Sequence, residues 1–145
     1  MTAPDFCQGI QHFGSTLPDF DRYGQEPAIA ADQTAISSPT DPQAVYQTLL
    51  AADALRYLTL QTTASKESGH PGGFASIAEA IAALVMLGYK NTVTEVGHHA
   101  PGFYSNMFLD RSLEAMGIKT VQEMGDRFRE MHGLLGHLSG QIPGL

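Results

Sequence analysis

Residues 54–84 read ALRYLTLQTTASKESGHPGGFASIAEAIAAL, and they contain two apolar segments with helical spacing joined by a turn of glycine and proline. A histidine, His70, stands inside that turn, between Gly69 and Pro71. Turn positions usually carry residues that suit the backbone conformation, whereas an imidazole donates, accepts and titrates near neutral pH. The position of His70 therefore suggests a functional role.

The two flanking segments are predicted helices. Upstream, Thr40 or Asp41 can cap a helix with proline in its first turn and apolar residues at helical spacing, so we predict a helix over about 42–64. Downstream, the letters SIAE from Ser76 have the form of a capping box. The segment that follows to Leu87 is apolar nearly all round, which predicts a buried helix.

The remaining segments give weaker signals. β-branched residues alternate in KNTVTEV, residues 90–96, which predicts a short strand or a connector. Residues 103–117 have the pattern of a helix. A second capping-box pattern at Thr120 and Glu123 predicts another helix, which runs to about Met131.

Composition limits the class of protein. A chain of 145 residues with 43% apolar residues can form one domain, which we place at residues 43–145, after an extended or partly ordered arm at residues 1–42. The net charge of −7, with no cluster among the eight Lys and Arg residues, argues against nucleic acid as a partner. No apolar run is long enough to span a membrane, and one cysteine, Cys7, without a secretory signal predicts a cytoplasmic protein.

Three of the six histidines, His70, His98 and His137, directly follow a glycine. With 15 glycines in 145 residues, chance would produce fewer than one such pair. Glycine lets a ligand approach the backbone closely, and imidazole can both donate and accept a proton. The repeated pair therefore favours a binding or catalytic role over an ordinary loop or packing role.

A zinc site and a cysteine–histidine dyad are the competing chemical interpretations. We expect the adjacent His98 and His99 to point apart, and His132 and His137 to face different sides of a helix, which disfavours a metal held by these histidines. Nothing in the sequence places Cys7 near a base. We therefore predict no metal site built from these histidines.

Three ordered segments resemble the motifs of transketolases. Residues 54–84 are similar to the family's opening helix, Ser-Gly-His-Pro-Gly loop and Ala-Glu-containing helix. Residues 97–117, GHHAPGFYSNMFLDRSLEAMG, are similar to its next signature, a Gly-His followed by Ala, Pro and a Tyr. Residues 127–144, RFREMHGLLGHLSGQIPG, resemble the third, with a Phe-Arg pair, a Gly-His and a Pro-Gly.

The resemblance implies the N-terminal part of a thiamine-diphosphate-dependent enzyme that transfers a two-carbon ketol unit between sugar phosphates. It implies an α/β fold with a mostly parallel sheet, of which this chain would be a helix-rich N-terminal portion, incomplete at the C-terminus. It further implies that Mg²⁺ holds the diphosphate of the cofactor, through ligands that lie outside this chain.

By motif match, the three histidines are the candidate catalytic residues. His70 resembles the histidine that hydrogen-bonds sugar hydroxyls and helps to move a proton. His98 looks like the one that reaches thiamine diphosphate. His137 resembles the one that binds the donor substrate near its terminal hydroxyl and carbonyl. Imidazoles that titrate near pH 7 suit the proton transfers of this chemistry.

The resemblance extends to neighbouring positions. Gly97 and Gly136 are expected to contact the cofactor together with His98, and Arg129 is expected to bind the substrate. His99 stands where the family usually has a small residue, so the resemblance assigns it no role.

The chain departs from the family pattern in two places. The segment between the first two Gly-His pairs is shorter, and NTVTEVG, residues 91–97, replaces the residues that usually lead into the second, which could displace His98. The chain also stops at Leu145, before the Gly-Asp-Gly…Asn motif that ligates Mg²⁺ in the family. We therefore expect no turnover without a complementary chain or the C-terminal portion, and a homo-oligomer with a dimer-type active site.

Two alternatives remain open. The letters HHAPGFYSNMFL, residues 98–109, are also similar to homodimeric pyruvate dehydrogenase E1 chains. The chain could instead be a non-catalytic interaction module that keeps its histidines by descent. Because the sequence offers only one weak strand to cover the predicted helix at residues 76–87, we also expect the isolated chain to self-associate or aggregate.

Overall fold

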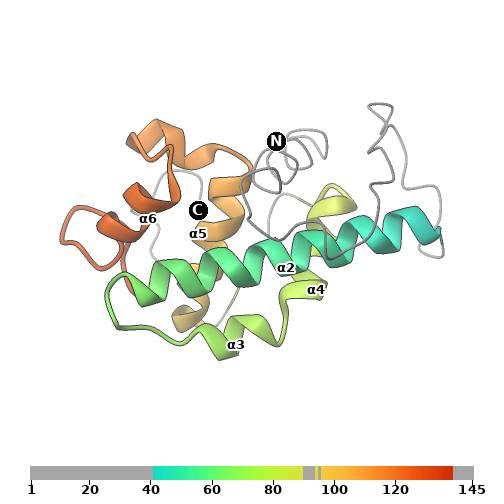
Figure 1. Cartoon of the computed structure of the whole chain (residues 1–145), viewed down its shortest axis with the longest axis horizontal. Coiled ribbons are helices and arrows are strands. Elements are labelled where there is room, and N and C mark those ends of the chain that lie inside the picture. The colour runs from blue at the N-terminus through green and yellow to red at the C-terminus, as the bar shows by residue number, and fades with distance from the viewer. Residues whose placement is uncertain (1–40, 90–93, 95, 139–145) are drawn as a thin grey trace.

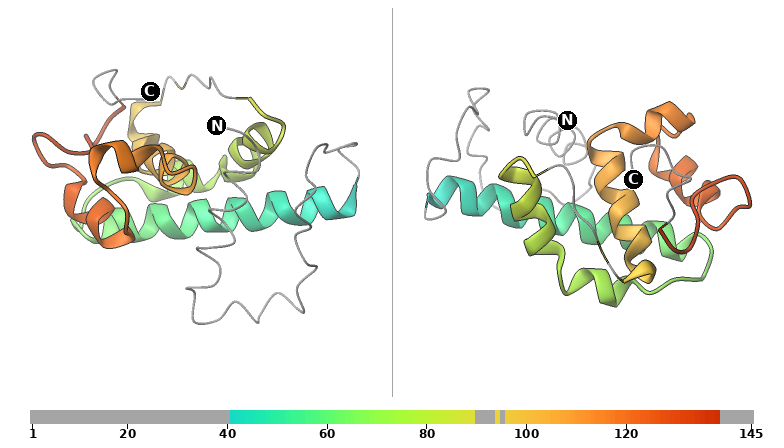
Figure 2. Two further views of the ribbon diagram at one scale, coloured as in Figure 1. Left: turned by 90° about the horizontal axis from the view of Figure 1, so that it is seen from above. Right: turned by 180° about the vertical axis from the view of Figure 1, so that it is seen from behind.

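The computed structural model describes residues 41–89, 94 and 96–138. Helical segments follow one another along these residues: α2 (Pro42–Ala64), α3 (Pro71–Ala75), α4 (Ala78–Met86), the 3-10 helix η2 (Gly97–His99), α5 (Ala100–Leu109), the 3-10 helix η3 (Ser112–Met116) and α6 (Val121–Arg127). Figure 1 shows α2 running across most of the described part, with the α6 region beyond its C-terminal end. Figure 2 shows the shorter helices gathered on one side of it.

The long helix α2 forms where the sequence predicts it. The Asp41 carboxylate accepts a hydrogen bond of 3.0 Å from the Gln43 backbone N–H, and Pro42 occupies the first turn. Buried threonines near its C-terminal end satisfy their own hydroxyls, since Thr59 and Thr62 donate to the carbonyls one turn earlier at 2.7 and 2.8 Å. The predicted helix over 42–64 is confirmed.

The segment after α2, which the sequence pattern predicts as a turn, contains the short helix α3. α3 begins at Pro71, and α4 begins only at Ala78. The predicted capping box at Ser76 is wrong, because the Ser76 hydroxyl donates to the Gly73 carbonyl at 2.7 Å and Glu79 turns toward α2.

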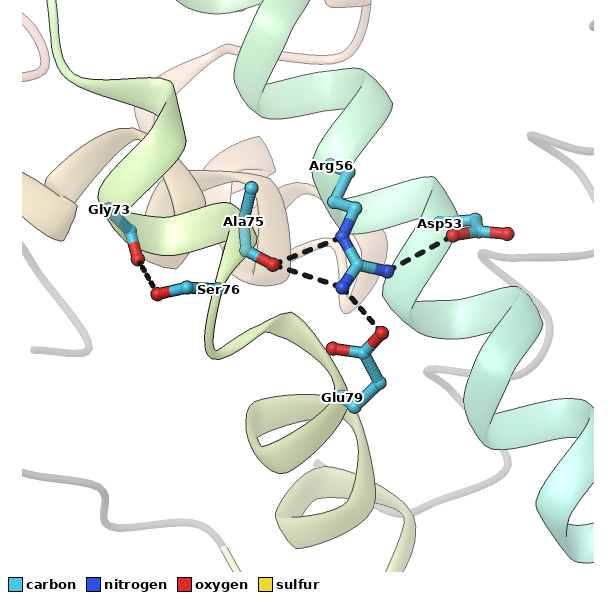
Figure 3. Close-up of polar contacts among 6 residues, drawn as sticks. All are labelled: Asp53, Arg56, Gly73, Ala75, Ser76 and Glu79. Atoms are coloured by element: carbon cyan, nitrogen blue, oxygen red, sulfur yellow. Dashed lines mark hydrogen bonds and ion pairs between the residues drawn. The ribbon is translucent and has the colours of Figure 1, made fainter.

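An arginine on α2 explains why Glu79 is diverted. The Arg56 guanidinium donates from Nε and Nη2 to the Ala75 carbonyl at 3.1 and 3.0 Å, and it forms ion pairs with Asp53 and Glu79 (Figure 3). Its hydrogen bond to Glu79 holds the pKa of that carboxyl below its usual range. One side chain of α2 thus holds the end of α3 and the start of α4.

The apolar side chains of α4 pack inward against α2. Ile81, Ala82, Val85 and Met86 are buried, so other helices of the chain cover this face of α4 where the sequence offers only one weak strand to do so. Among the described residues, the large apolar side chains that stay exposed are Val45, Leu49, Tyr57, Leu60, Leu87, Tyr89 and Met131. Self-association of the isolated chain stays a prediction.

The predicted helix over 103–117 is divided in two. α5 starts earlier, at Ala100, and the chain changes direction at Arg111, whose φ of 67° lies in the left-handed region. The second predicted capping box is confirmed, because the Glu123 N–H donates to the Thr120 hydroxyl at 3.2 Å and the Glu123 carboxylate accepts from the Thr120 N–H at 2.9 Å. α6 ends at Arg127, before the predicted end at Met131.

In the described ranges there is no β-strand, and pairing of extended backbone is limited to one parallel bridge between Phe128 and Leu134. Most of the strand predicted at residues 90–96, and residues 1–40 of the predicted arm with Cys7, lie outside the described residues. The α/β architecture therefore stays a prediction. None of the described helices combines the length and the apolar character needed to cross a bilayer.

A phenylalanine packed on a glycine joins α3 to α5. Phe74 is completely buried, and a Cβ built on Gly102 would lie 2.0 Å from two atoms of its ring. The Phe74 ring therefore fills the space that a side chain at position 102 would need. It also packs edge-on against the ring of Phe103, with the two ring centroids 6.1 Å apart. This contact sets the distance between the first and second Gly-His motifs.

We predict that Gly102→Ala lowers the free energy of unfolding by about 3 kcal/mol, because a fully buried ring cannot move aside for the methyl group. Gly72→Ala in α3 is the matched control. Nothing lies within 4 Å of a Cβ at that position, so its effect should stay within about 1 kcal/mol. Urea denaturation of both variants checks this, and equal losses would contradict the packing described.

Candidate functional site

The first two Gly-His pairs meet in the folded chain. The ring centroids of His70 and His98 lie 5.5 Å apart, and those of His98 and His99 lie 4.9 Å apart, each pair crossing at 83°. The prediction that His98 and His99 point apart is therefore wrong. Both rings turn toward the backbone of Gly73, where a built Cβ would lie 2.9 Å from His99 Nε2 and 3.2 Å from His98 Nε2.

The third Gly-His pair joins the second. A Cβ built on Gly97 would lie 2.8 Å from Cδ2 of His137, so this ring occupies the space beside the Gly97 backbone. The three pairs, which the sequence separates by many residues, thus lie in one region. We call His70, His98, His99 and His137 the histidine cluster.

The first motif is held by the end of α2. Gly69 has a φ of 133°, which a residue with a side chain rarely adopts, and a Cβ there would lie 2.6 Å from Cγ2 of Thr63. The backbone at position 69 can therefore contact Thr63 of α2 this closely only because residue 69 is a glycine. Pro71 then begins α3, with His70 at its N-cap position.

The third motif is anchored to the second by a tyrosine. The Tyr104 hydroxyl of α5 donates a hydrogen bond of 2.8 Å to the Leu135 carbonyl. Burial raises the pKa of Tyr104, so the hydroxyl keeps its proton and remains a donor. The Leu134 N–H also donates to the Arg127 carbonyl at 2.9 Å. These bonds fix the residues that lead to His137.

The members of the histidine cluster differ in exposure. His70 and His137 are exposed, His98 is half-buried and His99 is buried. Three imidazoles can therefore meet a polar ligand and exchange protons with it. His132, which the sequence did not link to a motif, is exposed on the turn before Gly133.

His99 has an unusual environment for a polar ring. It is 7% exposed, its ring meets Phe74 edge-on at 6.4 Å, and its buried Nδ1 has no hydrogen-bond partner among the described residues. An unpaired buried polar atom costs about 1–3 kcal/mol. Burial, with a smaller contribution from His98, lowers the pKa of His99 below the usual value, which favours the neutral ring. The resemblance to transketolases assigns this residue no role.

Arg129 lies beside the third motif. Its φ is 60°, its side chain is exposed, and its guanidinium carbon lies 5.8 Å from the centroid of the Phe128 ring. A Cβ built on Gly136 would lie 3.1 Å from Arg129 Nε. Gly136, which is predicted to contact the cofactor, and Arg129, which is predicted to bind the substrate, therefore lie side by side. His137 directly follows Gly136 in the chain. Residues 139–144 of this motif lie outside the described ranges.

The described residues were also searched for groups of possible metal ligands. Within residues 41–89, 94 and 96–138, no group of three or more His, Cys, Asp or Glu side chains is arranged to hold a metal ion. The cluster brings its rings together by edge-on contacts and by packing on glycine backbone.

We predict that the free energy of unfolding falls as the pH drops below about 6.5, and that His99→Phe reduces this fall. A buried neutral histidine has a lowered pKa in the folded state, so the unfolded chain binds more protons below its ordinary pKa and acid favours unfolding. Urea denaturation between pH 5 and 7.5 measures both slopes. The same pH dependence in the wild type and in His99→Phe would contradict the neutral, buried state of this ring.

Comparisons with known proteins add no family to these findings. A scan against models of protein families found no match to the chain, and searches of curated proteins and of solved structures found no significant match either.

Proposed function

We propose that the histidine cluster is the sugar-phosphate site of a thiamine-diphosphate-dependent, transketolase-like enzyme, which transfers a two-carbon ketol unit. The observation that carries the proposal is the meeting of three Gly-His pairs: His70 lies against His98, and His137 lies against Gly97. Packing alone does not require three solvent-accessible imidazoles at one place, whereas a polyhydroxylated ligand would use all of them.

The exposed and half-buried rings suit the proton transfers of ketol transfer. Each neutral imidazole has one N–H donor and one acceptor nitrogen, so it can bind a hydroxyl and then take or return its proton. In this proposal His70 binds hydroxyls and moves a proton, and His137 binds the carbonyl end of the donor. His98 faces the cofactor.

The surrounding groups are compatible with an anionic cofactor and substrate. The exposed Arg129 guanidinium beside Gly136 provides a cation for a phosphate group. The His137 ring lies beside Gly97 and the Arg129 side chain beside Gly136, so a ligand at these glycines would also meet these two side chains. Bound thiamine diphosphate would supply the nucleophilic carbon and the electron sink that side chains lack. In this proposal the Mg²⁺ ligands lie outside this chain, on a C-terminal portion or on a complementary chain. The enzyme is a cytoplasmic homo-oligomer with a dimer-type active site.

The proposal predicts that a ketose phosphate, or thiamine diphosphate with Mg²⁺, shifts the imidazole resonances of His70, His98 and His137. Hydrogen bonds to a charged ligand contribute about 1.5–3 kcal/mol, so His98→Ala should weaken binding about tenfold or more. Histidine-selective NMR titration of the chain, alone and with a complementary chain, measures both effects.

The exposed His132 provides the matched control. His132→Ala removes an imidazole outside the cluster and should leave the affinity unchanged. Binding of pyruvate in place of the ketose phosphate would point to a 2-oxoacid dehydrogenase. No shift in the cluster with any of these ligands would contradict the proposal and leave a non-catalytic module.

A further inference from the structure

We propose that His99 is a positioning residue: its buried ring holds the imidazole of His98 in one orientation over Gly73. The consequence for ligand binding rests on the proposed function of the histidine cluster. The orientation itself follows from the packing of the rings.

Two aromatic contacts fix the ring of His99. The ring of Phe74 packs edge-on against it, with 6.4 Å between the ring centroids and 79° between the ring planes. The ring of His98 does the same, with a centroid distance of 4.9 Å and an angle of 83°. Phe74 is itself completely buried against Gly102. The chain of contacts Gly102, Phe74, His99, His98 therefore runs from the core of the domain to a half-buried ring of the candidate site.

The contact between His98 and His99 is not a by-product of their adjacency. Consecutive residues on a helical turn do not normally face each other, yet here the Nε2 atoms of both rings turn toward the backbone of Gly73. The space that permits this exists because Gly73 has no Cβ. The rings of positions 98 and 99 and the glycine of position 73 thus form one packed unit.

Position 99 favours a side chain that is aromatic and uncharged. The edge-on geometry depends on an aromatic face and edge, which an aliphatic side chain of similar volume does not offer. The buried Nδ1 without a partner also makes a charged ring at position 99 unfavourable, so His98 faces a neutral neighbour. His99 therefore acts on a ligand only through His98.

Three substitutions separate positioning from space filling. His99→Phe keeps the ring, His99→Leu keeps apolar volume without a ring, and His99→Ala removes both. Carbon-13 relaxation of the His98 ring reports its order without any ligand, and titration with a ketose phosphate or with thiamine diphosphate and Mg²⁺ reports affinity. His132→Leu is the surface control, and amide spectra check that each variant folds.

We expect the His98 ring to stay ordered in His99→Phe and to become mobile in His99→Leu and His99→Ala. Affinity should stay within about twofold in the first and fall about two- to tenfold in the others. An equally ordered His98 ring in His99→Leu, or a mobile one in His99→Phe, would overturn the proposal.

The outcomes distinguish this inference from the proposed function. If His99→Ala does not fold, the comparison of Phe with Leu still decides the positioning role. If neither ligand binds the wild type but the ring order changes as expected, the proposed function fails and the positioning role stands. Ligand binding with unchanged ring order in His99→Leu gives the opposite result.

Discussion

The packing of the Phe74 ring on the backbone of Gly102 is the contact on which the rest of the arrangement depends. The ring occupies the place of the missing side chain, so α3 can approach α5 more closely than two ordinary residues would allow. That approach brings the motif before α3 to the motif before α5, and His70 to His98. Arg56 of α2 adds a polar contact at the end of α3, where its guanidinium donates two hydrogen bonds to the Ala75 carbonyl.

Glycine has a second role at the candidate site, where the absence of a side chain leaves room for the rings of other residues. Gly73 makes room for two imidazoles and Gly97 for a third. Gly73 and Gly97 therefore each accommodate rings that belong to another motif. Such a site combines accessible rings with buried support, because His98 packs against the buried His99, which in turn packs against the buried Phe74.

Local signals predicted what depends on local contacts. The cap at Asp41 and the capping box at Thr120 and Glu123 are satisfied within a few residues, and both are read correctly from the sequence. The capping box at Ser76 is wrong because Arg56, far away in the chain, takes its glutamate, a long-range contact that no local pattern encodes. The repeated Gly-His pair identified three histidines as candidate functional residues. Their meeting, and the part of His99 in it, depends on how α3 packs against α5.

The central claim is that the three Gly-His motifs meet through contacts of rings with glycine backbone. Nuclear Overhauser spectroscopy of the histidine-labelled chain tests it most directly. The account predicts cross-peaks between the ring protons of His70 and His98, and between those of His137 and the α-protons of Gly97, with none from His132 to the cluster. Strong signals within single residues, without cross-peaks between the motifs, would contradict it.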